Sequence, residues 1–166
     1  MLTMADHTEE LRLRFRDAMA SLAAHVNIIT TRGPGGTLGL TATAVCSITD
    51  TPPTVLVCIN KNSKTNEAFQ TNQRMCVNVL SSAQEDISRH FAGMAGSTMA
   101  ERFAMDIWDY GPLEQPQLRD ACACLEGQFA RQDECGTHYL YFLELKDIVV
   151  RDAGGLVYFK RKFVQV

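Results

Sequence analysis

The segment Leu38–Asn66 reads LGLTATAVCSITDTPPTVLVCINKNSKTN, and it decides the fold that the sequence predicts. Two strand-like apolar runs that carry several threonines lead into a polar cluster at Asn60–Asn66. Hydroxyls and backbone N–H groups donate to phosphate oxygens, and lysine adds a point charge, so the segment suits a phosphorylated cofactor. A purely structural explanation stays open, because threonine is common in strands and Ser, Thr and Asn are common in turns.

Apolar periodicity and turn residues predict a chain in which strands dominate. We expect helices over residues 9–24, 65–72, 83–91 and 99–103, and strands over residues 26–31, 38–48, 54–60, 75–80, 121–132, 138–151 and 156–159. The pairs Ser82/Glu85 and Thr98/Glu101 fit the S/T-x-x-E capping box that begins a helix. Because successive strands lack regular helical crossovers, the sequence predicts a mainly β fold with small helices, arranged as an antiparallel barrel.

Composition and charge narrow the class of protein. The chain has 166 residues, of which 46% are hydrophobic, and its formal net charge is −3. The charge argues against nucleic acid or an anionic membrane as partners. No apolar run approaches the roughly 20 residues that span a bilayer, and the charged N-terminal segment lacks a signal-peptide core. We therefore expect a single domain over residues 1–166, with a flexible terminus at residues 1–8, in the cytoplasm.

The cysteines and histidines offer no metal or redox motif. The six cysteines fall mostly within apolar, strand-like runs, at Cys46, Cys58, Cys76, Cys122, Cys124 and Cys135. None forms a C-x-x-C pair, and the four histidines show no metal-ligand spacing. We expect buried free thiols and no metal site. The glycine-rich segment 33–38 ends in leucine and precedes a strand, which argues against a Rossmann phosphate site.

A series of ordered motifs carries a family resemblance over roughly residues 11 to 163. The motifs are Phe15–Met19, Val26–Thr31, Thr41–Ser47, Asp50–Pro53, Cys76–Leu80, His90–Gly93, Glu101–Phe103, Gly136–His138 and Gly155–Phe159. In these motifs the chain resembles the short-chain flavin reductases. The resemblance implies an FMN-binding split β-barrel with Greek-key antiparallel strands. It also implies a homodimer with the flavin near the subunit boundary.

The resemblance further implies an enzyme that reduces FAD or FMN with NAD(P)H, NADH being favoured. Reduced flavin would then diffuse to a separate flavin-dependent oxygenase that hydroxylates a phenol. Hydride passes between stacked rings of the two cofactors, so the protein supplies position and hydrogen bonds, and no catalytic triad is needed. The alternative is a flavin-binding module of the same fold that stores or senses flavin without efficient NADH turnover.

The resemblance also assigns roles to individual positions. It places the flavin ring and ribityl chain against residues 41–44 and residue 47, and the phosphate at the polar cluster. The ring residues are Thr41, Ala42, Thr43, Ala44 and Ser47, and the phosphate residues are Asn60, Lys61, Ser63 and Thr65. The structural alternatives are simple strand propensity for the first set and an ordinary capped turn for the second.

His138 is implied to be the catalytic position, in contact with the nicotinamide or the flavin, although a histidine that enters a strand can be purely structural. Relatives often have Gly-Asp-His where this chain has Gly136-Thr137-His138, so a role for the acidic neighbour is absent. Phe91 and Phe163 either flank the flavin or belong to the barrel or dimer core, and relatives often place tyrosine at the position of Phe163. Trp108 and Tyr110 are interpreted as packing residues under the adjoining loop.

Overall fold

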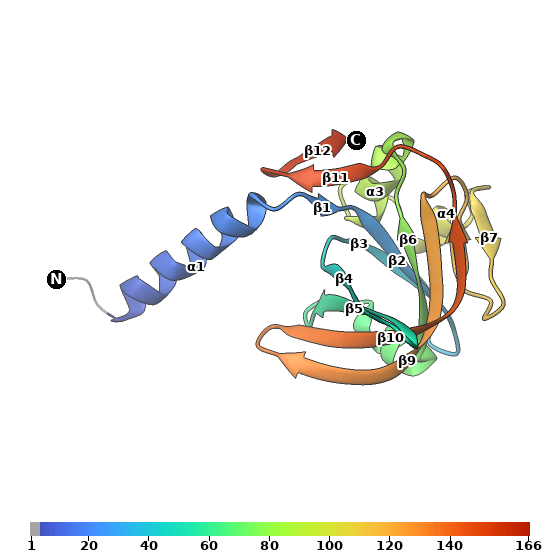
Figure 1. Cartoon of the computed structure of the whole chain (residues 1–166), viewed down its shortest axis with the longest axis horizontal. Coiled ribbons are helices and arrows are strands. Elements are labelled where there is room, and N and C mark those ends of the chain that lie inside the picture. Colours follow the sequence, from blue (N-terminus) through green and yellow to red (C-terminus); the bar gives the residue numbers. More distant parts are fainter. Residues whose placement is uncertain (1–3) are drawn as a thin grey trace.

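A curved, seven-stranded antiparallel sheet forms the body of the protein in this computed structural model, which describes residues 4–166 (Figure 1). The order of the strands across the sheet is β3-β2-β6-β9-β10-β5-β4. Their bounds are β2 (Asn27–Gly33), β3 (Gly36–Ala42), β4 (Val45–Asp50), β5 (Pro53–Asn60), β6 (Arg74–Val79), β9 (Ala123–Cys135) and β10 (His138–Val150). Each neighbouring pair in this sheet is antiparallel, which confirms the mainly β, antiparallel prediction.

The strand expected over residues 38–48 is divided, and the prediction of one continuous strand is wrong. β3 and β4 lie at opposite edges of the sheet, although only Thr43 and Ala44 separate them in the chain. Val45 N donates to Thr43 O over 2.9 Å, a bond between residues two apart that turns the chain sharply. The sheet therefore curves until its edges approach each other, and within residues 4–166 no ladder of strand pairs joins those edges.

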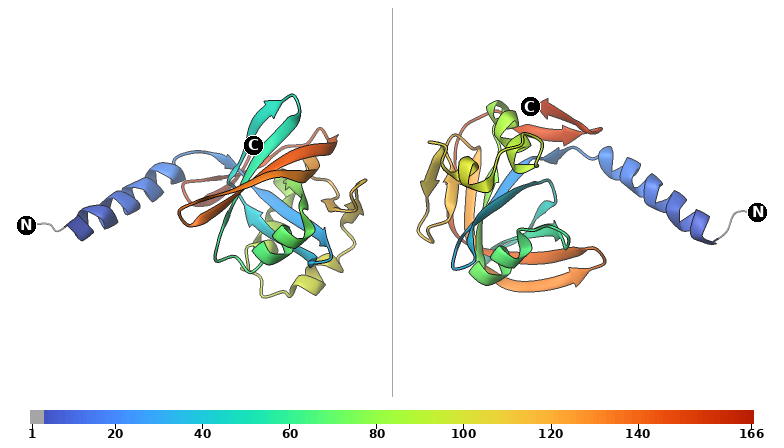
Figure 2. Two further views of the ribbon diagram at one scale, coloured as in Figure 1. Left: turned by 90° about the horizontal axis from the view of Figure 1, so that it is seen from below. Right: turned by 180° about the vertical axis from the view of Figure 1, so that it is seen from behind.

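The first helix stands away from the sheet. α1 (Met4–Ala20) projects from the body both in Figure 1 and in the view from below in Figure 2. It begins before the expected residue 9 and ends before residue 24, because Ser21 N and Leu22 N bond to carbonyls three residues back and tighten the last turn. Of the terminal segment 1–8, residues 4–8 are helical and residues 1–3 lie outside the described part.

Short helices lie against the sheet. They are α2 (Asn66–Asn72), the 3₁₀ turn η1 (Ser82–Gln84), α3 (Glu85–Phe91) and α4 (Met99–Phe103). The capping box of α4 is confirmed, since Thr98 N donates to Glu101 Oε2 over 2.7 Å; this bond lowers the pKa of the Glu101 carboxyl. The other box is displaced by one residue, to Ser81 and Gln84. Among residues 4–166, no helix is long and apolar enough to cross a membrane.

Two small sheets complete the fold, and most of their strands are too short for a periodic signal. β1 (Ala24–His25), β11 (Leu156–Phe159) and β12 (Lys162–Gln165) form one sheet, and β7 (Trp108–Tyr110) pairs with β8 (Pro116–Leu118). Trp108 is buried and donates to Arg102 O over 3.0 Å, so its packing role is confirmed. Tyr110 is 51% exposed, with the Arg32 guanidinium over its ring, so it is not a buried packing residue.

The cysteines are free, as predicted, but only two of them are buried. Cys76 and Cys124 belong to the core, whereas Cys46 and Cys135 are exposed. Cys46 lies on the edge strand β4, and Cys135 ends the long hairpin arm of β9, where the sheet has few neighbours. The expectation that the thiols are buried is therefore wrong at these exposed positions, because an apolar run in a strand does not show which face is covered.

Candidate functional site

Two adjoining cavities share the wall where β3 turns into β4. The shared residues are Thr41, Ala42, Thr43 and Ala92. The larger cavity has a volume of about 410 Å³; we call it the polar chamber, and it is also lined by Leu40, Ala44, Cys58, Ile59, Asn60, Ser63, Phe91 and His138. The smaller one, about 210 Å³, is the apolar chamber, and it is also lined by Val26, Met94, Tyr158 and Phe163.

Most of the predicted site residues therefore meet in one place. Strand register explains part of this, because β10 pairs with β5 so that His138 lies opposite Asn60. The turn at Thr43 and Ala44 lies beside β5, because Cys58 N donates to Ala44 O over 2.9 Å. The turn therefore lines the same chamber as Asn60 and His138. Sequence positions that are almost a hundred residues apart thus line the same chamber.

Thr41 and Phe91 fix α3 against β3. Thr41 Oγ1 donates to Ser88 O over 2.6 Å, so its hydroxyl proton is used within the protein. Phe91 is 4% exposed and lies so near β3 that a Cβ on Gly39 would come within 2.9 Å of Phe91 Cε1. The Phe91 ring also packs edge to face on Trp108, 5.7 Å between centroids. Phe91 is thus both a core residue and part of the chamber wall.

The loop between β5 and α2 holds the predicted phosphate residues in different environments. Ser63 lines the polar chamber, and its Oγ is 2.7 Å from Thr65 Oγ1. Thr65 is the buried N-cap residue of α2, which has only seven residues. Lys61 Nζ lies 2.5 Å from Glu134 Oε2 on β9 and so is already paired with a carboxylate. Of the predicted phosphate residues, only Ser63 and Asn60, the last residue of β5, line the polar chamber.

His138 is half-buried at the start of β10. Its Nδ1 lies 2.9 Å from Thr137 Oγ1, so threonine partners the ring where relatives often have aspartate. Thr137 O accepts the Lys61 backbone N–H over 2.9 Å, which ties this turn to the loop before α2. Gly136 has φ 53°, a left-handed conformation that glycine adopts without strain. The turn therefore places an imidazole at the rim of the polar chamber.

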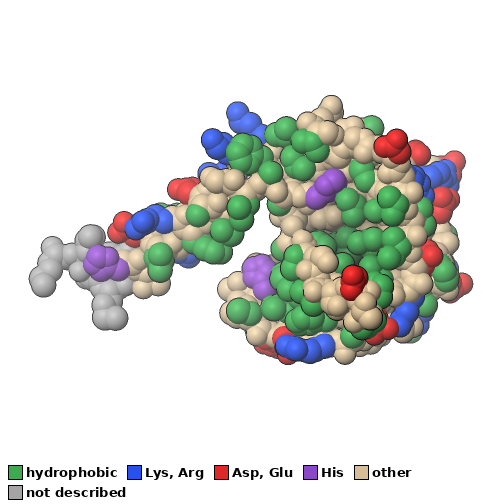
Figure 3. Space-filling view, in the orientation of Figure 1, with side chains coloured by type: hydrophobic (Ala, Val, Ile, Leu, Met, Phe, Trp, Pro, Cys, Tyr) green, Lys and Arg blue, Asp and Glu red, His purple; other side chains and the backbone are tan. Residues whose placement is uncertain are grey.

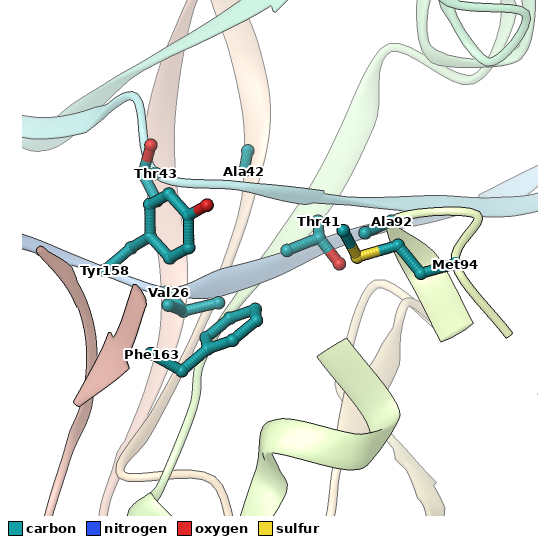
Figure 4. Close-up of a pocket in the computed structure, with 8 residues that line it drawn as sticks. All are labelled: Val26, Thr41, Ala42, Thr43, Ala92, Met94, Tyr158 and Phe163. Carbon is teal, nitrogen blue, oxygen red and sulfur yellow. The ribbon is translucent and has the colours of Figure 1, made fainter. Parts of the chain in front are cut away.

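The apolar chamber is lined by segments that are distant in the sequence, and no sequence pattern predicted that they meet. Tyr158 on β11 and Phe163 on β12 pack edge to face, 5.2 Å between ring centroids (Figure 4). Figure 4 shows Val26 beside Phe163, with Thr43 near the Tyr158 ring. The motif Gly155–Phe159 was a signal for Tyr158, but only the family pattern pointed to Phe163.

Three predicted positions lie outside both chamber walls. Ser47 is exposed on β4, and Lys61 and Thr65 have the partners described above. Cys58, which was not predicted as a site residue, lines the polar chamber, and burial raises the pKa of its thiol. The thiol is therefore neutral near neutral pH and adds no charge to the chamber. Among residues 4–166, no group of three or more His, Cys, Asp and Glu side chains is placed to hold a metal ion.

Comparison with known proteins assigns the family. The model of the flavin reductase like domain matches residues 19–166. The chain belongs to this family. It is 56% identical over 156 residues to the reductase component of 4-hydroxyphenylacetate 3-monooxygenase from Escherichia coli, a match that covers 93% of this chain and 92% of the relative. The resemblance inferred from the ordered motifs is therefore confirmed.

Solved structures of flavin reductases share the fold. The flavin reductase PheA2 superposes with a TM-score of 0.84 and 32% identity, covering 93% of this chain and 97% of that one. The NADH:FAD oxidoreductase SgcE6 of Streptomyces globisporus, solved in complex with NAD and FAD fragments, has a TM-score of 0.85 and 25% identity and covers 95% and 93% of the two chains. The two chambers of this chain thus belong to a flavin reductase fold.

Proposed function

We propose that the protein is an NAD(P)H-dependent flavin reductase that transfers hydride from a nicotinamide to FAD or FMN. The observation that carries this proposal is the pair of chambers that share Thr41, Ala42 and Thr43. A flavin has a polar tail and a polar pyrimidine edge on one side and an apolar dimethylbenzene edge on the other. A polar cavity that adjoins an apolar one along a single strand suits such a molecule.

The polar chamber offers groups that suit the polar parts of a flavin. Ser63 would donate to the phosphate, and Asn60 lines the same chamber. Thr65 would orient the serine hydroxyl, because its Oγ1 lies 2.7 Å from Ser63 Oγ. Lys61 would act at longer range, because Glu134 already pairs with it. At the turn, Thr43 and Ala44 would present backbone groups to the ring edge. Ser47, on the exposed side of β4, contributes less.

The protein's task in the reaction is to hold two rings face to face. A bound flavin supplies the hydride acceptor, and reduced nicotinamide supplies the hydride. His138 would hydrogen-bond the nicotinamide amide or its pyrophosphate and so fix the ring over the flavin; it need not transfer a proton. Phe91 forms an apolar wall of the polar chamber, and Phe163 does so in the apolar chamber. With flavin bound, both would help to exclude water from the ring.

The oxygenase partner follows from the family relatives. Because the chain is 56% identical to a 4-hydroxyphenylacetate 3-monooxygenase reductase component over 93% of its length, we infer that it supplies reduced flavin to a separate aromatic monooxygenase. NADH is the expected hydride donor.

A homodimer and a split barrel belong to the same proposal. The split-barrel description rests on the edges of the sheet, which approach each other at Thr43 and Ala44 without a joining ladder. α1 exposes Leu11 (67%) and Phe15 (61%), and Leu22 (59%) is exposed just after the helix ends. Figure 3 shows hydrophobic side chains along this helix and on the adjoining face of the body. Such a surface favours a second copy of the chain, which would bring the flavin near the subunit boundary.

The test is steady-state oxidation of NADH by the purified protein, with FMN, FAD or no flavin added. We expect NADH loss that depends on added flavin and scales with the protein concentration. A protein that retains flavin tightly but leaves NADH unchanged would be a flavin-storing or flavin-sensing module instead. Parallel assays with NADPH measure the nucleotide preference.

A further inference from the structure

The apolar chamber has one wall that the sheets do not supply. Met94 lies in the loop between α3 and α4 and lines this chamber, yet the residue is 67% exposed. Figure 4 shows the Met94 thioether turned toward Thr41 and Ala92, on the opposite side of the chamber from Tyr158. An exposed, large apolar side chain at the mouth of an apolar cavity is a surface that a ligand can cover.

The backbone of the loop fixes the place of Met94 while its side chain stays uncovered. Met94 N donates to Arg89 O over 2.9 Å, which ties the residue to the end of α3. Gly93, with φ 76°, turns the chain out of the helix. Farther along, Arg102 on α4 donates to Ser97 Oγ over 2.9 Å and to Ser97 O over 2.6 Å. The loop is therefore anchored at both ends.

We propose that Met94 is a positioning residue for the flavin ring: its thioether closes the apolar chamber over the dimethylbenzene end of the ring and sets how long the flavin stays bound. The inference rests on the proposed function and assigns the apolar chamber to one end of the ring. Methionine suits this task because its unbranched chain adapts to shape and its polarizable sulfur contacts aromatic ring edges favourably. The ring would then lie between Met94 on one side and Tyr158 and Phe163 on the other.

The test compares Met94→Ala and Met94→Leu with the control Val150→Ala, which removes an apolar side chain that is 74% exposed on β10 and lines neither chamber. Binding of lumiflavin, riboflavin and FMN is followed by quenching of flavin fluorescence, and dissociation by stopped flow. For Met94→Ala we expect the affinity for all three flavins to fall by a similar factor, roughly tenfold, with faster dissociation. Met94→Leu should restore most of the affinity, and Val150→Ala should bind like the unaltered protein.

Several outcomes would overturn this role. Unchanged affinity in Met94→Ala, or a loss confined to FMN, would show that Met94 does not contact the ring. A loss accompanied by a lower melting temperature, or shared by Val150→Ala, would indicate a structural effect. Because binding is measured without NADH, an unaltered protein that binds flavin but does not oxidise NADH would contradict the proposed function alone, and the affinities of the variants would still decide the role of Met94.

Discussion

Ser63 and Lys61 lie two residues apart, but their side chains have different partners. Ser63 faces the polar chamber, whereas Lys61 is paired with Glu134 and lies near the Tyr139 ring. A cation that is already paired loses part of its attraction for a second anion, because both anions compete for the same ammonium group. The hydroxyl, and not the nearest ammonium, is therefore expected to make the main contact with a flavin phosphate.

For Ser63→Ala we expect the affinity for FMN to fall about tenfold, since a hydrogen bond to a charged group contributes about 1.5–3 kcal/mol. Lys61→Ala should weaken binding less, and the double variant should lose at least the tenfold factor of the serine. Isothermal titration measures these affinities. Riboflavin, which has no phosphate, is the control ligand and should bind all variants equally. Equal affinity of Ser63→Ala and the unaltered protein for FMN would rule out this phosphate site.

His138 carries the second prediction at the scale of single residues. His138→Ala should lower kcat/KM for NADH by about ten- to hundredfold, equivalent to roughly 1.4–2.7 kcal/mol of lost orientation, and should change flavin affinity much less. Steady-state kinetics at saturating flavin and a separate flavin titration measure the two effects. A purely structural histidine would instead lower thermal stability and affect both ligands together. Normal NADH kinetics in a folded His138→Ala protein would remove His138 from the site.

At the scale of elements, β9 supports the loop that leads into β8. The Glu126 side chain is fully buried on β9, and its carboxylate accepts the backbone N–H groups of Leu113 (3.1 Å) and Gln115 (2.8 Å). Gln115 in turn bonds through its side chain to Arg32 on β2. One carboxylate therefore satisfies two donors of an irregular loop and links it to two strands of the main sheet.

Removing that carboxylate should be costly. Glu126→Ala leaves two backbone donors without their partner, and each unsatisfied buried group costs about 1–3 kcal/mol. We expect the free energy of unfolding, measured by urea titration, to fall by about 3 kcal/mol. The control is Glu134→Ala. The Glu134 side chain is 59% exposed in its ion pair with Lys61, so this change should lower the free energy of unfolding by less than about 1 kcal/mol. Similar small losses in both variants would contradict the structural role of Glu126.

Periodic elements were predictable from the sequence, and contacts between distant short segments were not. Alternating apolar residues identified β5, β6 and β10 nearly to their ends. The turn at Thr43 divided an apparently continuous strand, because a sharp turn between residues two apart needs no glycine or proline. Strands such as β7 and β8, with three residues each, are shorter than any period that a pattern can show.

The residues of the polar chamber were more predictable from the sequence than those of the apolar chamber. Residues 41–44 and 138 were implied by family motifs, and their hydroxyls and imidazole have recognisable chemistry. The apolar chamber was found only in part: the family pattern implied Phe163, but Met94 and Tyr158 are residue types that usually serve packing, and only the fold brings their segments together. Ser47 and Lys61 were also implied by the family resemblance. In the structure, however, Ser47 is exposed on β4 and Lys61 pairs with Glu134 on the distant strand β9, so neither lines a chamber.

At the scale of the whole molecule, the exposed apolar side chains of α1 support the proposed homodimer. A helix that projects from the body with leucine and phenylalanine in water is stabilised when a second copy covers it. We expect light scattering to give about twice the chain mass of 18.4 kDa, and Phe15→Glu to shift the protein toward the single-chain mass. A monodisperse 18.4 kDa particle at micromolar concentration would contradict the homodimer.

The most direct measurement is anaerobic mixing of the protein and FMN with NADH that carries deuterium at the transferred position of C4. We expect the flavin absorbance to bleach at a rate that rises with protein concentration and to bleach several times more slowly with deuterated than with ordinary NADH, because hydride transfer breaks that bond. With ordinary NADH, His138→Ala should bleach the flavin more slowly than the unaltered protein does. Flavin that stays bound and oxidised in the presence of excess NADH and NADPH would contradict a reductase.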